Sequence, residues 1–274
     1  MSGFKDLAGR VAVVTGGASG IGAGIARQLA AEGMRVVIAD VERDRLEQAS
    51  AEMGVLGLQV DVADSDSVKN LADSVLAELG AVHVVVNNAG VGAAANIVDM
   101  SLTDWRWVLD VNLYGVIYGV HHFLPLLLEN TEGGHIVNTA SIGGLAAMPA
   151  FGGYCVSKAG VVALTETLAL ELELAESKVG ASVLCPATVR TNIKNSSRNR
   201  PSGSERGGLS DIDVEAVTAD QGLRWLEPDD VGRSVVNGIR AGDRYILTHP
   251  ETYPTVQARH DAIADAFTTA SLRF

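Results

Sequence analysis

A phenol and an ammonium group are spaced four residues apart in the segment Tyr154-Cys-Val-Ser-Lys158. On a helix, residues four apart share a face, so a helix beginning near Tyr154 would place the two groups side by side. A free phenol has a pKa near ~10, whereas a base that removes a proton from an alcohol at neutral pH needs a pKa near ~7. A neighbouring positive charge narrows that gap by stabilising the phenolate. The pair therefore indicates acid/base chemistry at an alcohol or a carbonyl group.

A serine hydroxyl that could join this chemistry comes 13 residues before the tyrosine. Ser141 follows an apolar run, so we expect it at the end of the fifth strand, on the sheet edge where open α/β folds bind ligands. There its hydroxyl could hydrogen-bond a substrate oxygen. By itself, Tyr-x-x-x-Lys is a common spacing on helix surfaces. The catalytic interpretation therefore also depends on Ser141 and on a glycine-rich turn earlier in the chain.

The glycine-rich turn, Thr15-Gly-Gly-Ala-Ser-Gly-Ile-Gly22, leads from an apolar strand straight into a helix. Gly16, Gly20 and Gly22 let backbone amides and the positive end of the helix approach a pyrophosphate with no Cβ in the way. An ordinary tight turn is the alternative. Because a strand and a helix flank the glycines in the right order, we favour a dinucleotide-binding turn.

An aspartate ends the second predicted strand, 18 residues after the last glycine of the turn. Asp40 could accept hydrogen bonds from an adenosine ribose and would repel a 2′-phosphate, so the sequence favours NAD over NADP. The turn holds no cation, and we interpret Arg43 as a solvated helix residue. Asp61 and Val62, after the third strand, could hold the adenine edge. The alternatives are a plain strand-end role for Asp40 and a turn role for Asp61.

Seven apolar, β-rich runs alternate with helical segments and must position these groups. They predict an α/β fold: a Rossmann-type, doubly wound, mainly parallel seven-stranded sheet with helices on both faces. Glycines 33, 54, 80 and 180 are expected just past helix ends. Helices are expected to start at Ser65 or Asp66, at Thr103 with Asp104, and at Glu227-Pro-Asp-Asp230. The predicted strands are residues 11–15, 35–39, 56–60, 82–86, 135–139, 182–185 and 245–248.

We expect one domain over residues 1–274 with two additions. Residues 188–226 form a polar stretch that is too long for an ordinary connection in a compact domain. A substrate-binding lid is favoured there over a disordered insertion. Residues 250–274 are expected to form a C-terminal tail that contains a helix.

Composition narrows the class of ligand. The 274 residues are 47% hydrophobic and carry a net charge of −12, spread along the chain without a basic stripe. This argues against nucleic acid or an anionic membrane as partner and favours a small molecule. Residues 111–128 are the most apolar long run, but their polar residues and a proline argue against a membrane span. Cys155 and Cys185 lack metal-ligand spacing, so we expect no metal and a reducing, cytoplasmic location.

Joined in order, these motifs resemble the short-chain dehydrogenase/reductase family. The resemblance extends from Val11 to about Thr191 and includes Asn87-Asn-Ala-Gly90, Asn112 and Pro186-Ala-Thr-Val-Arg-Thr191. It implies a Rossmann-type sheet and nicotinamide-dependent oxidation or reduction at an alcohol or carbonyl carbon. The sequence departs from the family at Ala187, where glycine is usual, which makes the path of that loop less secure.

The resemblance also implies roles for individual residues. Tyr154 would be the general acid/base, Ser141 would orient the substrate oxygen, and Lys158 would bind the nicotinamide ribose and lower the phenol pKa. Asn112 would hold a water that links the lysine to solvent. The expected NAD-binding residues are Gly16, Ser19, Gly20, Ile21, Gly22, Asp40, Asp61, Val62, Asn88, Ala89, Gly90, Tyr154, Lys158, Pro186, Val189 and Thr191.

Small and apolar residues dominate the segments that should surround the substrate. They predict a roomy hydrophobic pocket for a bulky secondary alcohol or ketone, such as an aryl or alicyclic compound. A sugar would need more polar donors. The segment Thr248-His-Pro-Glu251 loosely resembles bacterial members that oxidise aryl-substituted secondary alcohols, although a plain strand-end role for His249 is preferred. The expected pocket residues are Ala94, Ser141, Leu145, Met148, Phe151 and Tyr154.

Two further expectations concern assembly and competing functions. Aromatic residues crowd residues 105–123, and helices of this kind pair between subunits in the family, so we expect a homodimer or homotetramer; packing inside the subunit is the alternative. A related epimerase or dehydratase would use the nicotinamide only transiently. A non-catalytic nucleotide-binding sensor would keep the fold without turnover, but its expected mark, loss of Ser141, Tyr154 or Lys158, is not seen.

Overall fold

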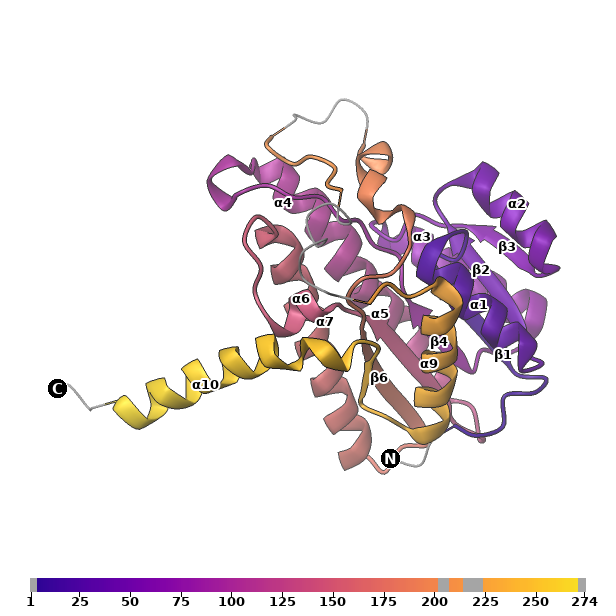
Figure 1. Ribbon diagram of the computed structural model, residues 1–274. Helices are drawn as coiled ribbons and strands as arrows, with labels where there is room; N and C mark the ends of the chain where they lie inside the picture. The colour runs from indigo at the N-terminus through magenta and orange to yellow at the C-terminus, as the bar shows by residue number, and fades with distance from the viewer. Residues whose placement is uncertain (1–3, 202–206, 214–223, 271–274) are drawn as a thin grey trace.

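The computed structural model describes residues 4–201, 207–213 and 224–270. Its centre is a seven-stranded parallel sheet in the order β3-β2-β1-β4-β5-β6-β7 (Figure 1). The predicted fold class is therefore confirmed. The strands are β1 Val11–Thr15, β2 Arg35–Asp40, β3 Leu56–Gln59, β4 Val84–Asn87, β5 Gly134–Thr139, β6 Val179–Cys185 and β7 Tyr245–Leu247.

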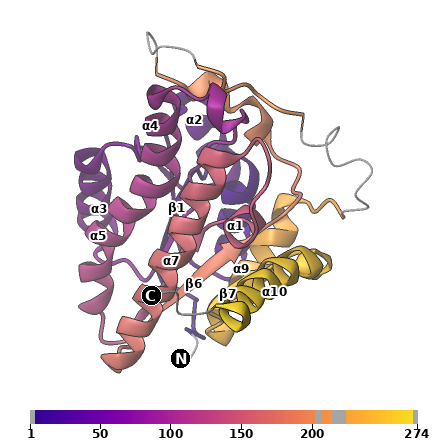
Figure 2. The ribbon, with the colours of Figure 1, turned by 90° about the vertical axis from the view of Figure 1, so that its left-hand side faces the viewer.

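Helices cover both faces of the sheet because alternate strand residues point to opposite sides. In β1, Ala12 and Val14 pack toward the helices α1, α2 and α9, whereas Val11 and Val13 pack toward α3, α5 and α7. Figure 2 shows α3 and α5 on one side of the strands and α9 on the other. These helices are α1 Gly20–Ala31, α2 Arg43–Met53, α3 Ser65–Leu79, α5 Gly115–Leu128, α7 Gly152–Leu174 and α9 Pro228–Ala241.

Other helical segments lie over the carboxyl ends of the strands or follow the last strand. These are η1 Ile97–Asp99, α4 Leu102–Leu109, the π-helix η2 Asp110–Tyr114, α6 Ile142–Leu145, η3 Asn192–Asn199, η5 Pro250–Thr252 and α10 Tyr253–Thr269. Residues 202–206 and 214–223 of the predicted lid lie outside the described residues.

The glycine predictions are right at three positions and wrong at one. Gly33, Gly54 and Gly80 follow helices with φ of 81°, 65° and 78°, the left-handed conformation that suits glycine. Gly180 lies inside β6, because that strand begins at Val179, three residues earlier than predicted. A Cβ on Gly180 would lie 2.7 Å from His135 Nδ1, so this glycine makes room for a ring on the neighbouring strand.

The predicted starts at residue 65 and at Pro228 agree with α3 and α9, but α4 begins earlier than expected. Ser101, rather than Thr103, is the N-cap residue. Its hydroxyl accepts a hydrogen bond from Asp104 N, and the Asp104 carboxylate accepts one from Ser101 N. This reciprocal capping box satisfies two amides that the first helical turn leaves free.

The apolar run at residues 111–128 belongs to a helical stretch that packs on the sheet. Among the described residues, one helical stretch, Leu102–Leu128, has the length and the apolar composition that crossing a membrane would need. Phe123 and Leu127, however, are fully buried against β4, β5 and α3. The run is therefore best explained as a core helix.

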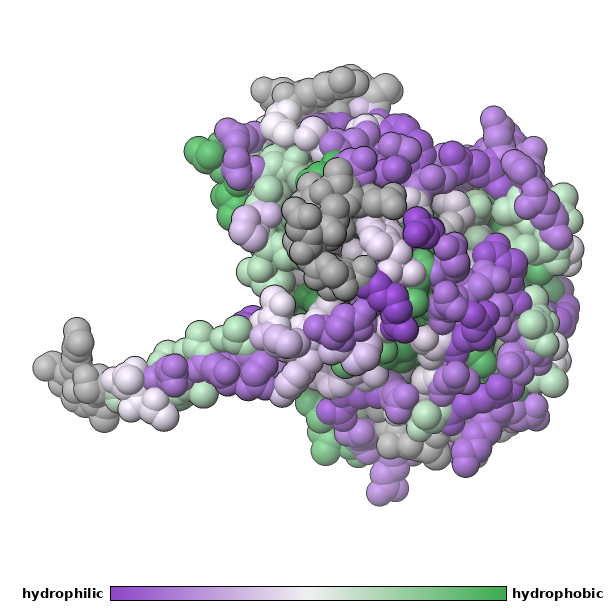
Figure 3. Space-filling model, viewed as in Figure 1, coloured by the Kyte–Doolittle hydropathy of each residue, from purple (hydrophilic) through white to green (hydrophobic). Residues whose placement is uncertain are grey.

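The helix α10 projects away from the rest of the chain (Figure 1). Val256, near its start, is its buried residue, whereas Phe267 near its end is 80% exposed. Figure 3 shows hydrophilic and hydrophobic residues side by side on this projecting helix.

His135, which is buried in β5 next to β6, should make the stability of the protein depend on pH. Burial lowers the pKa of His135 from 6.5 to about 4, and its Nε2 lies 2.7 Å from Ser182 Oγ. Because the unfolded chain takes up this proton below pH 6.5 and the folded chain does not, stability is lost as the pH falls toward 4. The loss should reach about 3 kcal/mol. Urea unfolding between pH 7 and 4.5 should show a shallower pH dependence for His135→Gln than for wild type; equal slopes would contradict the assignment.

Candidate active site

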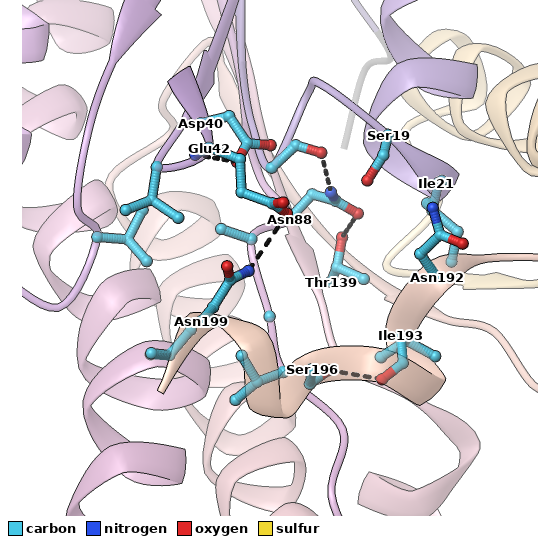
Figure 4. A pocket seen from close by; sticks show the side chains of 18 of the residues that line it. Ser19, Ile21, Asp40, Glu42, Asn88, Thr139, Asn192, Ile193, Ser196 and Asn199 are labelled. Carbon is cyan, nitrogen blue, oxygen red and sulfur yellow. Dashed lines mark hydrogen bonds between the residues drawn. The ribbon is translucent and has the colours of Figure 1, made fainter. Parts of the chain in front are cut away.

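A groove opens at the carboxyl ends of the strands, beside the point where the strand order reverses between β1 and β4. Residues at the ends of six different strands meet there, together with side chains of α7 and of residues 191–201. Figure 4 shows Ser19, Asp40 and Asn88 from three of these strand ends, together with Asn192 and Asn199. The groove is lined by Gly16, Ser19, Gly20, Ile21, Asp40, Val41, Glu42, Val60, Asp61, Val62, Ala63, Asn88, Ala89, Gly90, Val91, Trp107, Val111, Thr139, Ala140, Tyr154, Lys158, Pro186, Thr191, Asn192, Ile193, Ser196, Arg198, Asn199 and Pro201.

The glycine turn forms a cradle that side chains would fill. Gly16 has a φ of +63°, and a Cβ on it would lie 2.8 Å from Ala89 Cα. A Cβ on Gly22 would lie 2.1 Å from Gly16 O. Ser19 caps α1 in extended conformation without a side-chain hydrogen bond, so the first amides of this helix are open to an anion. The donor set therefore fits the diphosphate of a dinucleotide.

Asn88, which follows β4, braces the turn from the neighbouring strand. Its side-chain nitrogen donates to Thr15 O at 3.0 Å, and its backbone nitrogen donates to Thr15 Oγ1 at 2.9 Å. The Asn88 side chain thus stabilises the glycine turn by a direct hydrogen bond. Ala89 and Gly90, which follow it, line the groove.

At the other end of the groove, two acidic residues lie where β2 ends: Asp40 is its last residue, and Glu42 follows it. Asp40 Oδ2 accepts a hydrogen bond from Ala18 N at 3.2 Å, and Oδ1 accepts one from Glu42 N at 3.1 Å. Burial raises the pKa of Asp40, while these hydrogen bonds oppose the rise. The carboxylate is thus held in place at the rim, where a ribose hydroxyl could donate to it.

The phenol and the ammonium group lie together because α7 begins just before the tyrosine. Lys158 Nζ lies 5.8 Å from the centroid of the Tyr154 ring and donates to Thr139 O at 2.8 Å. Burial lowers the pKa of Lys158 to about 8. The predicted helix-face pairing is therefore present, although the ammonium hydrogen-bonds the strand carbonyl.

The phenol pKa differs from the expectation. Burial raises the pKa of Tyr154, and a hydrogen bond with the Ser141 side chain partly offsets that rise. Ser141 Oγ also accepts from Gly143 N at 3.1 Å and donates to Pro186 O at 3.4 Å, so it is fixed between β5 and α6. In the protein by itself, desolvation outweighs the hydrogen bond with Ser141, so the pKa of the phenol is raised and not lowered.

Asn112 is fully buried in the π-helix η2 and ties this helix to the groove. Its Oδ1 accepts from Val91 N at 2.8 Å, and its Nδ2 donates to Val91 O at 2.9 Å. A wide turn inside a helix is frequent at functional sites, because it redirects a side chain that a regular helix would point elsewhere. Here it brings the amide beside Gly90 and Lys158.

Two of the predicted cofactor residues do not line the groove. Gly22 supports the turn from behind, and Val189 is buried in the core next to Leu226. The backbone amide of Ala187, where glycine was expected, donates to His249 Nδ1 at 3.3 Å. The strand-end histidine therefore supports this loop.

The predicted pocket residues are spread around Tyr154, which alone among them lines the groove. The Phe151 ring contacts the Tyr154 ring edge-on, with 6.2 Å between centroids. Met148 packs near Gly143, and Ala94 pairs with Ser210. Leu145 packs on the cluster that contains Val162. Their role in substrate binding stays a prediction.

Sequence reasoning missed part of the groove. Trp107 comes from α4 and Glu42 follows β2. The other missed side chains that are best placed for contact come from the polar stretch after Thr191, which has no periodic pattern to mark it. Among the described residues, no cluster of three or more histidine, cysteine or acidic side chains could hold a metal ion. The missed residues with side chains best placed for contact are Glu42, Trp107, Ile193, Ser196, Arg198, Asn199 and Pro201.

The sequence of this chain is similar to those of known dehydrogenases. The sequence model of a family described as short chain dehydrogenase matches residues 10–202. C alpha-dehydrogenase of Sphingobium sp. strain SYK-6 is 32% identical over 271 residues, which are 96% of this chain and 88% of that protein. Meso-2,3-butanediol dehydrogenase of Serratia marcescens is 35% identical over 189 residues, 68% of this chain and 74% of that protein.

Solved structures of short-chain dehydrogenases have the same fold as this chain. A short-chain dehydrogenase/reductase of Burkholderia phymatum, crystallised in complex with NAD, superposes with a TM-score of 0.87 at 37% sequence identity, covering 98% of this chain and 99% of that chain. A short-chain dehydrogenase structure from Novosphingobium aromaticivorans superposes with a TM-score of 0.80 at 34% identity, covering 98% and 90% of the two chains.

Proposed function

The chain belongs to the short-chain dehydrogenase family, and on that premise we propose that it is an NAD-dependent oxidoreductase that interconverts a bulky, hydrophobic secondary alcohol and its ketone. The observation that carries the proposal is the meeting of Ser141, Tyr154 and Lys158 beside a groove whose far half is a glycine cradle. A proton acceptor and a dinucleotide site are thereby joined in one cavity.

The reaction follows from the positions of these side chains. Ser141 donates a hydrogen bond to the substrate oxygen and holds it near the Tyr154 phenol. When bound, NAD would supply the acceptor for the hydride of the carbinol carbon and a positive charge. Tyr154 would take the O–H proton as the C–H electron pair leaves to that acceptor and the carbon–oxygen double bond forms. The reverse direction returns the proton from Tyr154 to the carbonyl oxygen.

Lys158 and Asn112 complete the proton path. The ammonium group would stabilise the phenolate form of Tyr154 and would hold the nicotinamide ribose. Asn112 holds a water that links Lys158 to solvent. Both side chains lie near Gly90, because a Cβ built there would lie 3.2 Å from Asn112 Oδ1 and 3.6 Å from Lys158 Nζ.

The preference for NAD is attributed to Asp40. Replacing Asp40 with asparagine removes the charge that would repel a 2′-phosphate, so the ratio of kcat/KM for NADP to that for NAD should rise by roughly tenfold or more. Steady-state kinetics with both cofactors measures this ratio. Asp44→Asn, at an exposed acidic residue in the first turn of α2, is the matched control and should leave the ratio unchanged. An unchanged ratio in Asp40→Asn would contradict the assignment.

Apolar walls support the proposed substrate class. Trp107, Val111, Ile193 and Pro201 are among the residues that line the groove. A panel of aryl, alicyclic and small secondary alcohols, with sugars for comparison, tests it through the rate of NADH formation. Substrate turnover without net NADH would favour an epimerase or dehydratase.

We also propose a homodimer or homotetramer in the cytoplasm. Tyr114 and Leu128, at the two ends of the α5 region, are 45% and 52% exposed, whereas Trp107 and Phe123 pack inside the chain. Tyr114 and Leu128 are therefore available for contact with a partner. Both cysteines are free thiols, as suits a reducing compartment. Size-exclusion chromatography with light scattering measures the assembly.

A further inference from the structure

An ion pair crosses the groove at its adenosine end. Arg198, in η3, donates from Nη2 to Glu42 Oε1 at 2.6 Å and from Nε to Glu42 Oε2 at 3.1 Å. Asn199 Nδ2 donates to the same carboxylate at 3.3 Å. Figure 4 shows Glu42 and Asn199 reaching toward one another across the pocket. Two segments 156 residues apart in the sequence are thereby joined above the groove.

Other residues of the segment 191–201 are anchored to Gly92 and to the helix α4. Ser196 Oγ accepts a hydrogen bond from Gly92 N at 2.9 Å. Arg200 Nη2 lies 2.5 Å from the buried Asp104 carboxylate, and its guanidinium lies 5.6 Å from the centre of the Trp107 ring. These contacts hold one side of the segment. Glu42 holds the other, on the opposite rim.

The pair at the adenosine rim is stronger than an ordinary surface pair. The side chains of Arg198 and Glu42 are only 31% and 20% exposed. The hydrogen bond with Arg198 lowers the pKa of Glu42, and the same bond raises the pKa of Arg198. The contact uses both carboxylate oxygens, a geometry that guanidinium groups favour. Arg45, on the same side of the groove as Glu42, lies 3.2 Å from its carboxylate and helps to position it.

We infer that Glu42 and Arg198 form an ionic clamp that closes the adenosine end of the groove and slows the exchange of the bound dinucleotide. This inference rests on the proposed function, since it takes the groove to be the dinucleotide site. Both rims line that groove, so entry and exit of the adenosine require the bridge to open. The clamp also explains how a polar segment without a regular pattern is held over the cofactor.

Stopped-flow release of NADH from the full-length protein, followed by its fluorescence, tests the clamp. Arg198→Met and Glu42→Gln should each speed release by about three- to tenfold, because a partly buried, bidentate pair is lost. Arg43→Met is the matched control: this exposed arginine of α2 pairs with Glu47 at 3.3 Å and lies outside the groove lining, so release should stay at the wild-type rate. Raising the salt concentration should speed release from wild type more than from Arg198→Met.

The double variant separates a clamp from two independent effects. If Glu42 and Arg198 act together, the double variant should release NADH no faster than either single variant. Wild-type release by Arg198→Met, or multiplicative effects in the double variant, would overturn the clamp. Failure of the wild-type protein to bind NADH in the same fluorescence assay would overturn the proposed function itself, which distinguishes the two failures.

Discussion

Replacing Tyr154 with phenylalanine is expected to lower kcat for oxidation of an accepted secondary alcohol by about 10²- to 10⁴-fold, the range that a positioned proton acceptor contributes. The substitution removes the phenolic oxygen and keeps the ring that contacts Phe151. Steady-state formation of NADH measures the rate. Because the ring is retained, the dissociation constant for NAD should change little.

A second phenol serves as control for that substitution. Tyr253, at the start of α10, is 61% exposed and lies outside the groove-lining set. Tyr253→Phe should keep the wild-type kcat. A Tyr154→Phe enzyme that keeps more than about a tenth of the wild-type kcat would show that another group moves the proton.

Replacing Gly22 with alanine is expected to weaken NAD binding by roughly 10- to 100-fold, because a methyl group forced into a filled space costs about 1–3 kcal/mol. The new Cβ would lie 2.1 Å from Gly16 O and 2.6 Å from Asn88 Nδ2. Either contact shifts the turn that should cradle the diphosphate. Isothermal titration of the folded variant with NAD measures the loss.

Gly24, two residues further along the same helix, separates cofactor binding from stability. A Cβ on Gly24 would lie 2.2 Å from Pro228 O, where α1 crosses α9. Gly24→Ala should therefore lower the melting temperature and leave the NAD affinity of the folded protein near the wild-type value. Equal losses of affinity in the two variants would show that the effect of Gly22→Ala is a general loss of structure.

Features encoded by local pattern could be predicted from the sequence. The strand runs are apolar and β-rich, and the turn at Gly16 needs a backbone conformation that glycine adopts readily. The boundary at Gly180 was missed because glycine at a helix end and glycine in a strand look alike in sequence. Its reason for being there is His135, which lies 45 residues away and is brought close by strand pairing.

Features that depend on tertiary packing could not be predicted. The raised pKa of Tyr154 results from burial, and a helix-face argument that considers only Lys158 does not include that effect. The Glu42–Arg198 contact joins residues whose sequence separation leaves no local signal. Arg198 is the cation near Asp40 that the sequence did not reveal, because the interpretation considered only residues near the turn and the second strand.

The central claim, that Tyr154 takes a proton from an alcohol while the carbinol hydrogen leaves as hydride, is tested most directly by isotope transfer. A secondary alcohol carrying deuterium on the carbinol carbon is mixed with excess enzyme and NAD, and the reduced cofactor is analysed by mass spectrometry. We expect the deuterium to appear in the reduced cofactor in a single turnover, at a rate that collapses in Tyr154→Phe. Unlabelled reduced cofactor, or an equal rate of label transfer in Tyr154→Phe, would contradict the claim.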